Sequence, residues 1–259
     1  MSRVLEGKAA IITGASSGIG LATVKLFVDS GATVLGVDLS PAPSAVPLGE
    51  NFQFHQVNLT EPSAASSIIA AFTSAFPSKD NIDILVNNAG IMDNNEGVDT
   101  LTDDVYQRVI AVNLTSPIKL MGEVVKIMKQ NGGGSIVNVS SKAGSSGASA
   151  GVAYTASKHG LLGATKNTAW LYKEDSIRCN AISPGAVRTN IANSMDMASM
   201  DLCSSMKIAP VIACHVNTQT GAGTAGPEVA AQAILFLASD LSKGITGAVL
   251  PVDNGWSVI

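Results

Sequence analysis

Short runs of β-branched and aliphatic residues alternate with longer stretches of helical apolar spacing along the whole chain. This alternation is typical of a parallel sheet whose strands are joined by crossover helices. The predicted strands are Lys8–Ile12, Thr33–Asp38, Phe52–Asn58, Ile82–Val86, Ser135–Val139, Ile177–Ile182 and Ala248–Val252. The predicted helices are Gly18–Asp29, Ser63–Phe76, Thr102–Gln130, Ala153–Tyr172 and a last one from Gly226-Pro227-Glu228 to about Ala238.

This succession predicts a single α/β domain over residues 1–259, a doubly wound Rossmann-type fold. Its seven-stranded, mainly parallel sheet would be flanked by helices, with ligands beyond the carboxyl ends of the strands. Thr102-Asp103-Asp104 is a cap signal for the longest helix, and Gly132-Gly133-Gly134 ends it. Residues 190–226 have weak periodicity, with many small, polar and Met residues, and no helix is predicted there.

The composition fits a large globular core. Of 259 residues, 46% are hydrophobic and only 14% are charged, which excludes a disordered chain. The 16 basic and 20 acidic residues give a net charge of −4, which argues against a nucleic-acid partner. The three cysteines lack CxxC spacing, the histidines lie far apart, and no apolar run is long enough for a membrane span. We therefore expect a cytoplasmic protein with no metal and no membrane partner.

A glycine-rich turn, Thr13-Gly14-Ala15-Ser16-Ser17-Gly18-Ile19-Gly20, joins the first strand to its helix. Gly14 permits a tight turn, and Gly18 and Gly20 let the backbone approach a pyrophosphate closely. Free amides at the helix N-terminus then face the negative charge. The spacing is GxxxGxG, not the general GxGxxG fingerprint, so a structural turn without ligand stays open as an alternative.

Asp38 ends the second predicted strand, where its carboxylate can accept from both hydroxyls of an adenosine ribose and would repel a 2′-phosphate. Leu39 and Ser40 follow it, and the glycine turn contains no Arg or Lys. NAD is therefore expected in preference to NADP, with an ordinary helix or turn cap as the alternative role of Asp38.

Tyr154 and Lys158 lie four residues apart on a predicted helix and so share one face. A free tyrosine has a pKa of about 10, and a nearby ammonium, helped by a nicotinamide cation, lowers that pKa. Tyr154 can then take a proton during alcohol oxidation or give one during ketone reduction. The spacing alone is also common by chance on helices.

Two other polar residues complete the candidate site. Ser141, thirteen residues before Tyr154, can hydrogen-bond the substrate oxygen, and the pattern does not separate it from Ser140. Asn113 interrupts a helix otherwise patterned for burial, and a buried amide needs partners. A satisfied core amide is the alternative interpretation of Asn113.

These residues fall in motifs that resemble the short-chain dehydrogenase/reductase family from Gly7 to Gly255. The motifs are TGASSGIG at Thr13–Gly20, NNAG at Asn87–Gly90, VNVSS at Val137–Ser141, YTASK at Tyr154–Lys158 and PGAVRT at Pro184–Thr189. The resemblance implies that Ser141, Tyr154 and Lys158 form the catalytic triad. It implies that Asn113 is a fourth member, which holds a water in the proton relay from Lys158.

The resemblance also implies the contacts to a nicotinamide dinucleotide. The implied contact residues are Gly14, Ser16, Ser17, Gly18, Ile19, Asp38, Asn58, Leu59, Asn88, Ala89, Gly90, Tyr154, Lys158, Pro184, Gly185, Val187 and Thr189. Asn58 stands where the family usually has an acidic residue at the adenine, and its amide is expected to accept from the adenine amino group. Val252-Asp253-Asn254-Gly255 departs from the family's usual Asp-Gly-Gly.

Residues 190–226 correspond to the family's variable substrate lid. This stretch holds Met195, Met197, Met200 and Met206 with Ile191, Leu202 and Ile208, which suits an adaptable apolar surface or plain packing against the core. Only Arg188 and Lys207 lie near it, so no basic cluster would clamp a substrate phosphate. We expect an NAD-dependent enzyme for an apolar secondary alcohol or ketone, such as a terpenoid, steroid-like or polyketide-derived molecule.

Three other readings stay open. They are ketone reduction with NAD(P)H in vivo, a catalytically silent cofactor-binding regulator, and a redox-neutral isomerase or lyase, which no feature supports. The resemblance implies a homotetramer or homodimer, paired through the helices Thr102–Gln130 and Ala153–Tyr172. The small residues Ala153, Ala156, Gly160, Gly163 and Ala164 would permit close helix packing there or against the sheet.

Overall fold

The β-branched runs of the sequence form one parallel sheet in the computed structural model, which describes residues 3–217 and 219–258. The strands lie in the order β3-β2-β1-β4-β5-β6-β7, and all of the pairs are parallel. Their bounds are β1 Ala9–Thr13, β2 Thr33–Asp38, β3 Phe52–Gln56, β4 Ile84–Asn87, β5 Gly134–Val139, β6 Ile177–Pro184 and β7 Val249–Val252. This confirms the predicted fold class, with strand ends that differ from the predictions by at most two residues.

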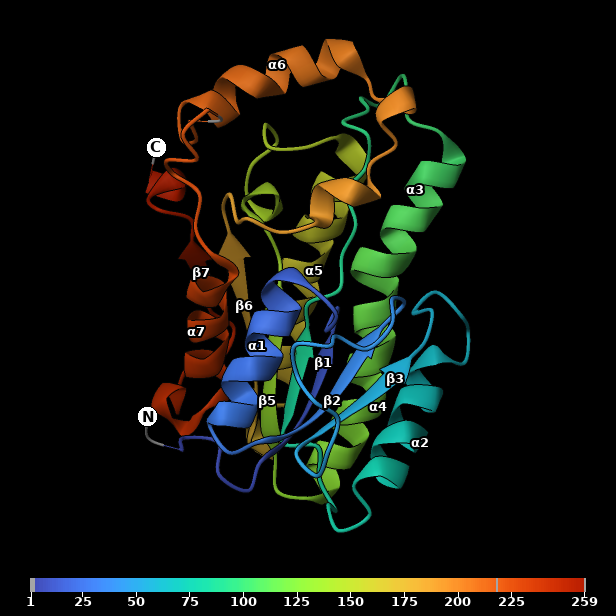
Figure 1. Ribbon diagram of the computed structural model, residues 1–259, viewed down its shortest axis with the longest axis vertical. Helices are drawn as coiled ribbons and strands as arrows, with labels where there is room; N and C mark the ends of the chain where they lie inside the picture. The colour runs from blue at the N-terminus through green and yellow to red at the C-terminus, as the bar shows by residue number, and fades with distance from the viewer. Residues whose placement is uncertain (1–2, 218, 259) are drawn as a thin grey trace.

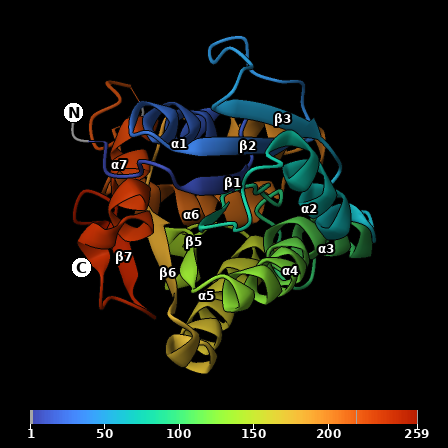
Figure 2. The ribbon, with the colours of Figure 1, turned by 90° about the horizontal axis from the view of Figure 1, so that it is seen from below.

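Helices cover both faces of this sheet (Figures 1 and 2). Their bounds are α1 Gly18–Asp29, α2 Ala64–Ala75, α3 Asp103–Ile110, α4 Ser116–Gln130, α5 Val152–Leu171, α6 Leu202–Ala213 and α7 Pro227–Ala238. Helices α1 and α7 pack together on one face, and α2, α4 and α5 lie on the other (Figure 2). In the described residues, no helix has the length and apolarity needed to cross a membrane.

Adjacent residues of β1 show how the two cores are built. Ile12 packs with Phe27 of α1 and Ile234 of α7. Its neighbour Ile11 points the other way and packs with Phe72 of α2 and Val124 of α4. Because successive side chains of a strand face opposite sides, a strand covered on both faces must be apolar throughout. The five residues of β1 are accordingly all buried.

The chain order places a switch point between β1 and β4. From β1 the chain runs outward through β2 to β3, and it then crosses to the other side of β1 to form β4. Crossovers that leave in opposite directions open a crevice beyond the carboxyl ends of the two strands. The glycine-rich turn follows β1, and the Asn87-Asn88-Ala89-Gly90 motif begins at the last residue of β4, so both lie at that crevice.

The structure refines the helical pattern in two places. The stretch Thr102–Gln130 is not one regular helix, because a π-helical turn, Ala111–Thr115, separates α3 from α4. Residues 190–226 do contain a helix, α6, which lies across the end of the molecule above the carboxyl edge of the sheet (Figure 1). The sequence pattern missed α6 because it contains Pro210 and none of its residues is buried, so it has no single apolar face to detect.

Candidate active site

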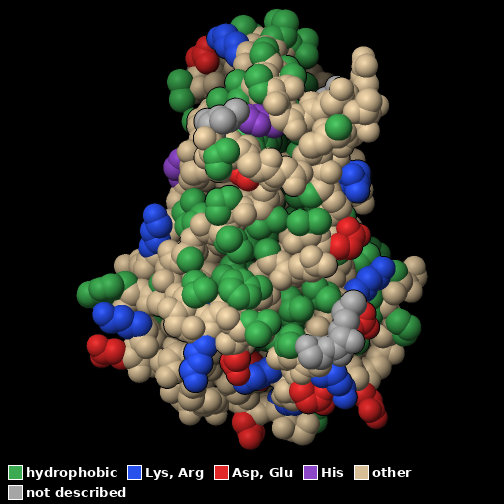
Figure 3. Space-filling model, turned by 90° about the vertical axis from the view of Figure 1, so that its left-hand side faces the viewer, with side chains coloured by type: hydrophobic (Ala, Val, Ile, Leu, Met, Phe, Trp, Pro, Cys, Tyr) green, Lys and Arg blue, Asp and Glu red, His purple; other side chains and the backbone are tan. Residues whose placement is uncertain are grey.

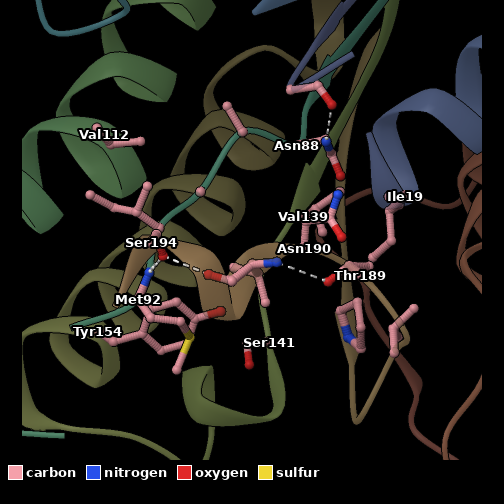
Figure 4. A pocket seen from close by; sticks show the side chains of 18 of the residues that line it. Ile19, Asn88, Met92, Val112, Val139, Ser141, Tyr154, Thr189, Asn190 and Ser194 are labelled. Carbon is pink, nitrogen blue, oxygen red and sulfur yellow. Dashed lines mark hydrogen bonds between the residues drawn. The ribbon is translucent and has the colours of Figure 1, made fainter. Parts of the chain in front are cut away.

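A cleft of about 530 Å³ opens beyond the carboxyl ends of the central strands. The glycine-rich turn forms one wall, and the first turns of α5 and the residues after β5 form the opposite wall (Figure 4). Residues 184–194, which follow β6, close the third side. The cleft therefore lies where a doubly wound sheet binds its ligand.

The three glycines of the turn are packed too closely to carry a side chain. A Cβ on Gly14 would lie 2.6 Å from Asn88 Nδ2, and a Cβ on Gly20 would collide with the Gly14 carbonyl oxygen. Gly18 has a φ of +54°, in the left-handed region, and a Cβ there would lie 3.0 Å from Thr189 Cγ2. The turn therefore presents bare backbone to the cleft.

Within the residues that the structure describes, the start of α1 lacks a side-chain cap. Its N-cap, Ser17, makes no side-chain cap hydrogen bond, and its first turn contains no acidic residue. The amides at a helix N-terminus need an acceptor and form an anion site when they open into a cleft. A dinucleotide pyrophosphate fits this arrangement, with Gly18 and Ile19 beside it.

Asp38 is held by two amides at the edge of the same cleft. Ser16 N donates to Asp38 Oδ2 at 3.0 Å, and Ser40 N donates to Asp38 Oδ1 at 2.9 Å. Each oxygen keeps a second lone pair, so the carboxylate can still accept from ribose hydroxyls. The hydroxyl of Ser16 does not face the cleft, since it donates to the Pro41 carbonyl at 2.8 Å. Ser16 thus supports Asp38, and its contact with the cofactor stays a prediction.

The adenine side of the cleft differs from the expectation at Asn58. Asn58 Oδ1 accepts from Thr60 N at 3.1 Å and from Thr60 Oγ1 at 2.9 Å. Both lone pairs of that oxygen are used, so the group left for an adenine is the amide nitrogen. Asn88 is likewise committed, because its Nδ2 donates to the carbonyls of Thr13 and Gly14 at 2.9 and 3.2 Å. Asn88 therefore ties the turn after β4 to the glycine turn after β1.

Tyr154 and Ser141 lie close together on the same wall of the cleft (Figure 4). Burial raises the pKa of Tyr154 to about 12, and the charge of Asp93 adds to this rise, while a hydrogen bond with the Ser141 hydroxyl lowers the pKa. Ser140 points elsewhere, since its hydroxyl donates to the Lys158 carbonyl at 3.2 Å. The two serines that the sequence left unresolved are thus distinguished by geometry, which favours Ser141.

Lys158 lies one helical turn after Tyr154, with its Nζ 5.5 Å from the centroid of the tyrosine ring. The ammonium donates to the Val139 carbonyl at 2.9 Å and is almost fully buried. Burial lowers the pKa of Lys158 to about 8, because a charged group in an apolar setting is costly. The lysine is therefore held at the end of β5, between the tyrosine and the floor of the cleft.

Asn113 lies in the π-helical turn, behind the lining of the cleft, and is fully buried. Its side chain accepts from Ile91 N and donates to Ile91 O, both at 2.9 Å, and it also donates to Ser157 Oγ at 3.1 Å. Pro117 stands four residues later and has no N–H to give to the Asn113 carbonyl. The side chain thus fixes the backbone after Gly90, and the carbonyl is left without its usual helical donor.

The segment after β6 closes the cleft opposite the glycine turn. Pro184, Gly185, Val187 and Thr189 line it. A Cβ on Gly185 would lie 2.8 Å from Asp253 Cβ, so only glycine allows this turn to pack against the chain after β7. Val187 is held by a parallel bridge to Ala225, at the far end of the variable segment.

Most of the predicted site residues therefore meet in one place. The predicted residues that line the cleft are Gly14, Ser17, Gly18, Ile19, Asp38, Asn58, Leu59, Asn88, Ala89, Gly90, Ser141, Tyr154, Lys158, Pro184, Gly185, Val187 and Thr189. Two predicted residues, Ser16 and Asn113, lie behind this lining and act on it through hydrogen bonds.

The substrate end of the cleft was poorly predicted. The methionines of residues 190–226 do not line it, and Met197 and Met206 are each 70% exposed. The lining there comes from residues with no motif of their own, namely Ile91, Met92, Lys142, Ile191, Ser194, Ile212 and Trp256. Lys142, next to Ser141, is buried and donates to Ser257 Oγ at 3.3 Å. Its proximity in sequence to Ser141 was the one available signal.

The fold and this site together define an oxidoreductase of the Rossmann type that uses a nicotinamide cofactor. A family model described as enoyl-(acyl carrier protein) reductase matches residues 14–257. The chain belongs to the short-chain dehydrogenase/reductase family. It is an NAD(P)-dependent oxidoreductase.

Relatives and solved structures agree with this assignment. The short chain dehydrogenase ple7 of Rhodocybe pseudopiperita is 54% identical over 98% of this chain and 100% of its own length. A 3-ketoacyl-(acyl-carrier-protein) reductase of Brucella melitensis, solved with NADH, is 28% identical over 98% of this chain and 99% of its own, with a TM-score of 0.83. A putative gluconate 5-dehydrogenase of Beutenbergia cavernae, solved with NADP, is 26% identical over the full length of both chains, with a TM-score of 0.80.

Proposed function

We propose that this enzyme interconverts a secondary alcohol and a ketone and prefers NAD to NADP. The observation that carries the proposal is that Ser141, Tyr154 and Lys158 meet at one end of the cleft whose other wall is the bare glycine turn. A bound nicotinamide would take a hydride from the carbinol carbon or return it to the ketone. The protein's part is to bind, orient and move the proton.

Each residue of the site has a separate task. Tyr154 takes the hydroxyl proton in oxidation and returns it in reduction, and Ser141 donates a hydrogen bond to the same substrate oxygen. Lys158 holds the nicotinamide ribose and, as an ammonium, stabilises the Tyr154 phenolate. The Asn113 carbonyl, which has no donor from Pro117, would hold a water that passes the proton on from Lys158.

The preference for NAD rests on Asp38. Its carboxylate faces the cleft and is fixed by two backbone amides. Two ribose hydroxyls can donate to it, whereas a 2′-phosphate would meet a like charge at the same place. Leu39 and Ser40 also line this part of the cleft and offer no cation for a phosphate.

An apolar substrate suits the rest of the cleft. Beside Ser141 and Tyr154, the lining includes Ile91, Met92 and Trp256, which provide an apolar surface for an uncharged terpenoid, steroid-like or polyketide-derived molecule. The segment 190–226, which we propose as the lid of a single catalytic domain, also exposes apolar side chains. Figure 3 shows hydrophobic side chains at the top of the molecule, where α6 lies, and Leu202 and Met206 of α6 are 68% and 70% exposed.

The reductive direction is the second candidate. With its pKa raised to about 12, Tyr154 carries its proton at neutral pH in the protein alone, which is the form needed to protonate a ketone. A tyrosine at its ordinary pKa is protonated at neutral pH as well, so the raised pKa supports reduction without excluding oxidation. The equilibrium between the two directions then depends on the cofactor ratio rather than on this site.

The deciding experiment is a cofactor-coupled screen. The purified protein is mixed with NAD and a panel of apolar secondary alcohols, and separately with NADH and the matching ketones, while the absorbance of the reduced nicotinamide is followed. Turnover of apolar compounds that is lost in Tyr154→Phe would support the proposal. A preference for small sugars or acyl-carrier thioesters would overturn the substrate class, and turnover that Tyr154→Phe retains would overturn the mechanism.

We also propose that the enzyme is a homotetramer or homodimer that pairs through α4 and α5. Ile118 of α4 and Trp170 of α5 are 46% and 67% exposed, and Ala156 and Gly163 lie exposed on α5. Gly160 does not contribute, because it packs against Leu114 within the same chain. Light scattering of the wild type and of Trp170→Glu would test this, and a monomeric wild type would contradict it.

A cytoplasmic location is the last part of the proposal. Cys179 is buried, Cys203 and Cys214 are exposed, and all three are free thiols. Free exposed thiols suit a reducing compartment. Fractionation of cells of the source organism would test it, and recovery with a secreted or organellar fraction would contradict it.

A further inference from the structure

The first turn of α5, which carries Tyr154, takes its cap from a distant loop. The N-cap residue of α5 is Gly151, which has no side chain to offer. Instead, the Asp93 carboxylate accepts from Gly151 N at 3.1 Å and from Tyr154 N at 2.8 Å. Amides at the start of a helix have no acceptor within the helix. Asp93, which lies 61 positions before Tyr154 in the sequence, therefore caps α5.

Asp93 is fixed in this place. It is fully buried, and Asn95 N donates a third hydrogen bond to it at 3.2 Å. Burial raises the pKa of Asp93, and the three backbone hydrogen bonds oppose that rise. A Cβ on Gly151 would come within 2.6 Å of Asp93 Oδ2, so the carboxylate can approach the helix only because this residue is glycine.

The same short loop holds the proposed lid. We call Met92–Glu96 the 92–96 loop. The two residues on either side of Asp93, Met92 and Asn94, contact residues 190–226. Asn94 accepts from Asp196 N at 2.8 Å through its side chain and from Asp201 N at 3.0 Å through its backbone. Ser194 Oγ, which lines the cleft, accepts from Met92 N at 2.8 Å (Figure 4).

Glu96 joins the two sets of contacts. Its carboxylate accepts from Asn94 N at 2.7 Å and from Asn94 Nδ2 at 3.1 Å, which fixes the residue that holds the lid. Its own carbonyl accepts from Val152 N, the first residue of α5, at 2.9 Å. The 92–96 loop is therefore hydrogen-bonded to the lid and also to three amides at the start of α5, those of Gly151, Val152 and Tyr154.

We propose that Asp93 is a positioning residue for Tyr154, and that the 92–96 loop transmits the position of the lid to the first turn of α5. This inference rests on the proposed role of Tyr154 as the proton-transfer residue. A substrate that orders the lid over the cleft would hold Asn94 in place. Through Asp93 it would then fix the backbone of Tyr154 with respect to the substrate oxygen.

Asp93→Asn is the direct test, and Asp83→Asn is its matched control. Asp83 also accepts from a backbone amide, Ala9 N at 2.8 Å, but at the amino end of the sheet. Asp93→Asn should lower kcat by about 10- to 100-fold with an unchanged dissociation constant for NAD, because a small misplacement of a reacting group has effects of this size. The acid limb of the pH profile for oxidation should also move to lower pH, since a negative charge near Tyr154 is removed.

The Gly151→Ala variant separates the effect of the position of the Asp93 carboxylate from the effect of its charge. Its methyl group would displace the carboxylate and leave the charge nearby, so kcat should fall while the acid limb stays close to that of the wild type. A merely structural role for Asp93 would lower the folded fraction equally at all pH values and would not distinguish these two variants. Wild-type kcat in folded Asp93→Asn would overturn the positioning role.

Hydrogen exchange of the Tyr154 amide tests the link without any turnover. Asn94→Ala removes the acceptor of Asp196 N and does not touch α5. If the loop transmits position, this amide exchanges faster in Asn94→Ala and Asp93→Asn than in the wild type or Asp83→Asn. Unchanged exchange in Asn94→Ala would overturn the transmission. If the amide exchanges faster in these two variants but the wild type oxidises no alcohol, the proposed function is overturned and the link still stands.

Discussion

Lys158 Nζ lies 5.5 Å from the centroid of the Tyr154 ring, one turn further along α5, and both side chains are buried. Burial acts on the two in opposite directions, raising the pKa of Tyr154 to about 12 and lowering that of Lys158 to about 8. Each shift favours the uncharged form, so the protein alone does not prepare a phenolate. A further positive charge beside the pair is needed, and an oxidised nicotinamide supplies one.

Removal of the Tyr154 hydroxyl should abolish proton transfer and leave cofactor binding intact. General acid–base catalysis by one side chain is worth about 10²- to 10⁴-fold, so Tyr154→Phe should lower kcat by that factor. The NAD affinity, measured by calorimetry, should stay that of the wild type. Tyr172→Phe removes the same group near the other end of α5 and should have wild-type kcat. Comparable losses in both variants would point to packing rather than catalysis.

Lys158 should make the stability of the free enzyme depend on alkaline pH. Its pKa is 10.5 in the unfolded chain and about 8 in the fold, so between these values the unfolded state binds more protons. Stability therefore rises with pH across this window. The shift corresponds to roughly 3 kcal/mol in the free energy of unfolding, at about 1.4 kcal/mol per pKa unit.

Lys158→Met removes this titration and isolates its effect. The wild type should gain stability relative to Lys158→Met as the pH rises from about 8 to 10.5, measured by urea unfolding without cofactor. Below pH 8 the difference between the two proteins should be constant. A difference that shrinks or stays flat across the alkaline window would show that Lys158 is not held in an unfavourable charged state.

Periodicity was enough for the strands and most helices because the central strands are buried on both faces and most helices present an apolar stripe. It did not show the π-helical turn at Asn113, because one extra residue in a turn leaves the apolar spacing almost unchanged. It failed again at α6, whose apolar residues, such as Leu202 and Met206, face outward. The motifs found the cofactor half of the cleft, since close backbone packing restricts the residue types there.

The substrate half had no such restriction. Met92, Ile212 and Trp256 line it, but an apolar residue in a cleft looks the same in sequence as an apolar residue in a core. Asp93 is a different case, since its partners Gly151 and Tyr154 lie about sixty positions away. Only the packed chain shows that this carboxylate caps the catalytic helix.

Asp38 should set the choice of cofactor. Asp38→Asn keeps the shape of the side chain and removes its charge, so the repulsion of a 2′-phosphate is lost. The ratio of kcat/KM for NAD to that for NADP should fall by about 10- to 100-fold, equivalent to the 1–3 kcal/mol of one charged hydrogen bond. Asp29→Asn, on the exposed end of α1, is the control. An unchanged ratio in Asp38→Asn would leave Asp38 as a cap of the glycine turn only.

Gly20 tests whether the bare backbone of the turn is needed for binding. Alanine is usually favoured over glycine inside a helix, by about 0.5–1 kcal/mol. At Gly20, however, the added Cβ would collide with the Gly14 carbonyl oxygen and would lie 2.6 Å from Asn88 Nδ2, so the turn must shift. Gly20→Ala should therefore lose NAD affinity by about 100-fold, since the amides facing the pyrophosphate move with the turn. Gly49→Ala, where a Cβ would meet nothing within 4 Å, should bind NAD like the wild type. Wild-type affinity in Gly20→Ala, measured by calorimetry on folded protein, would show that the cofactor does not sit on this turn.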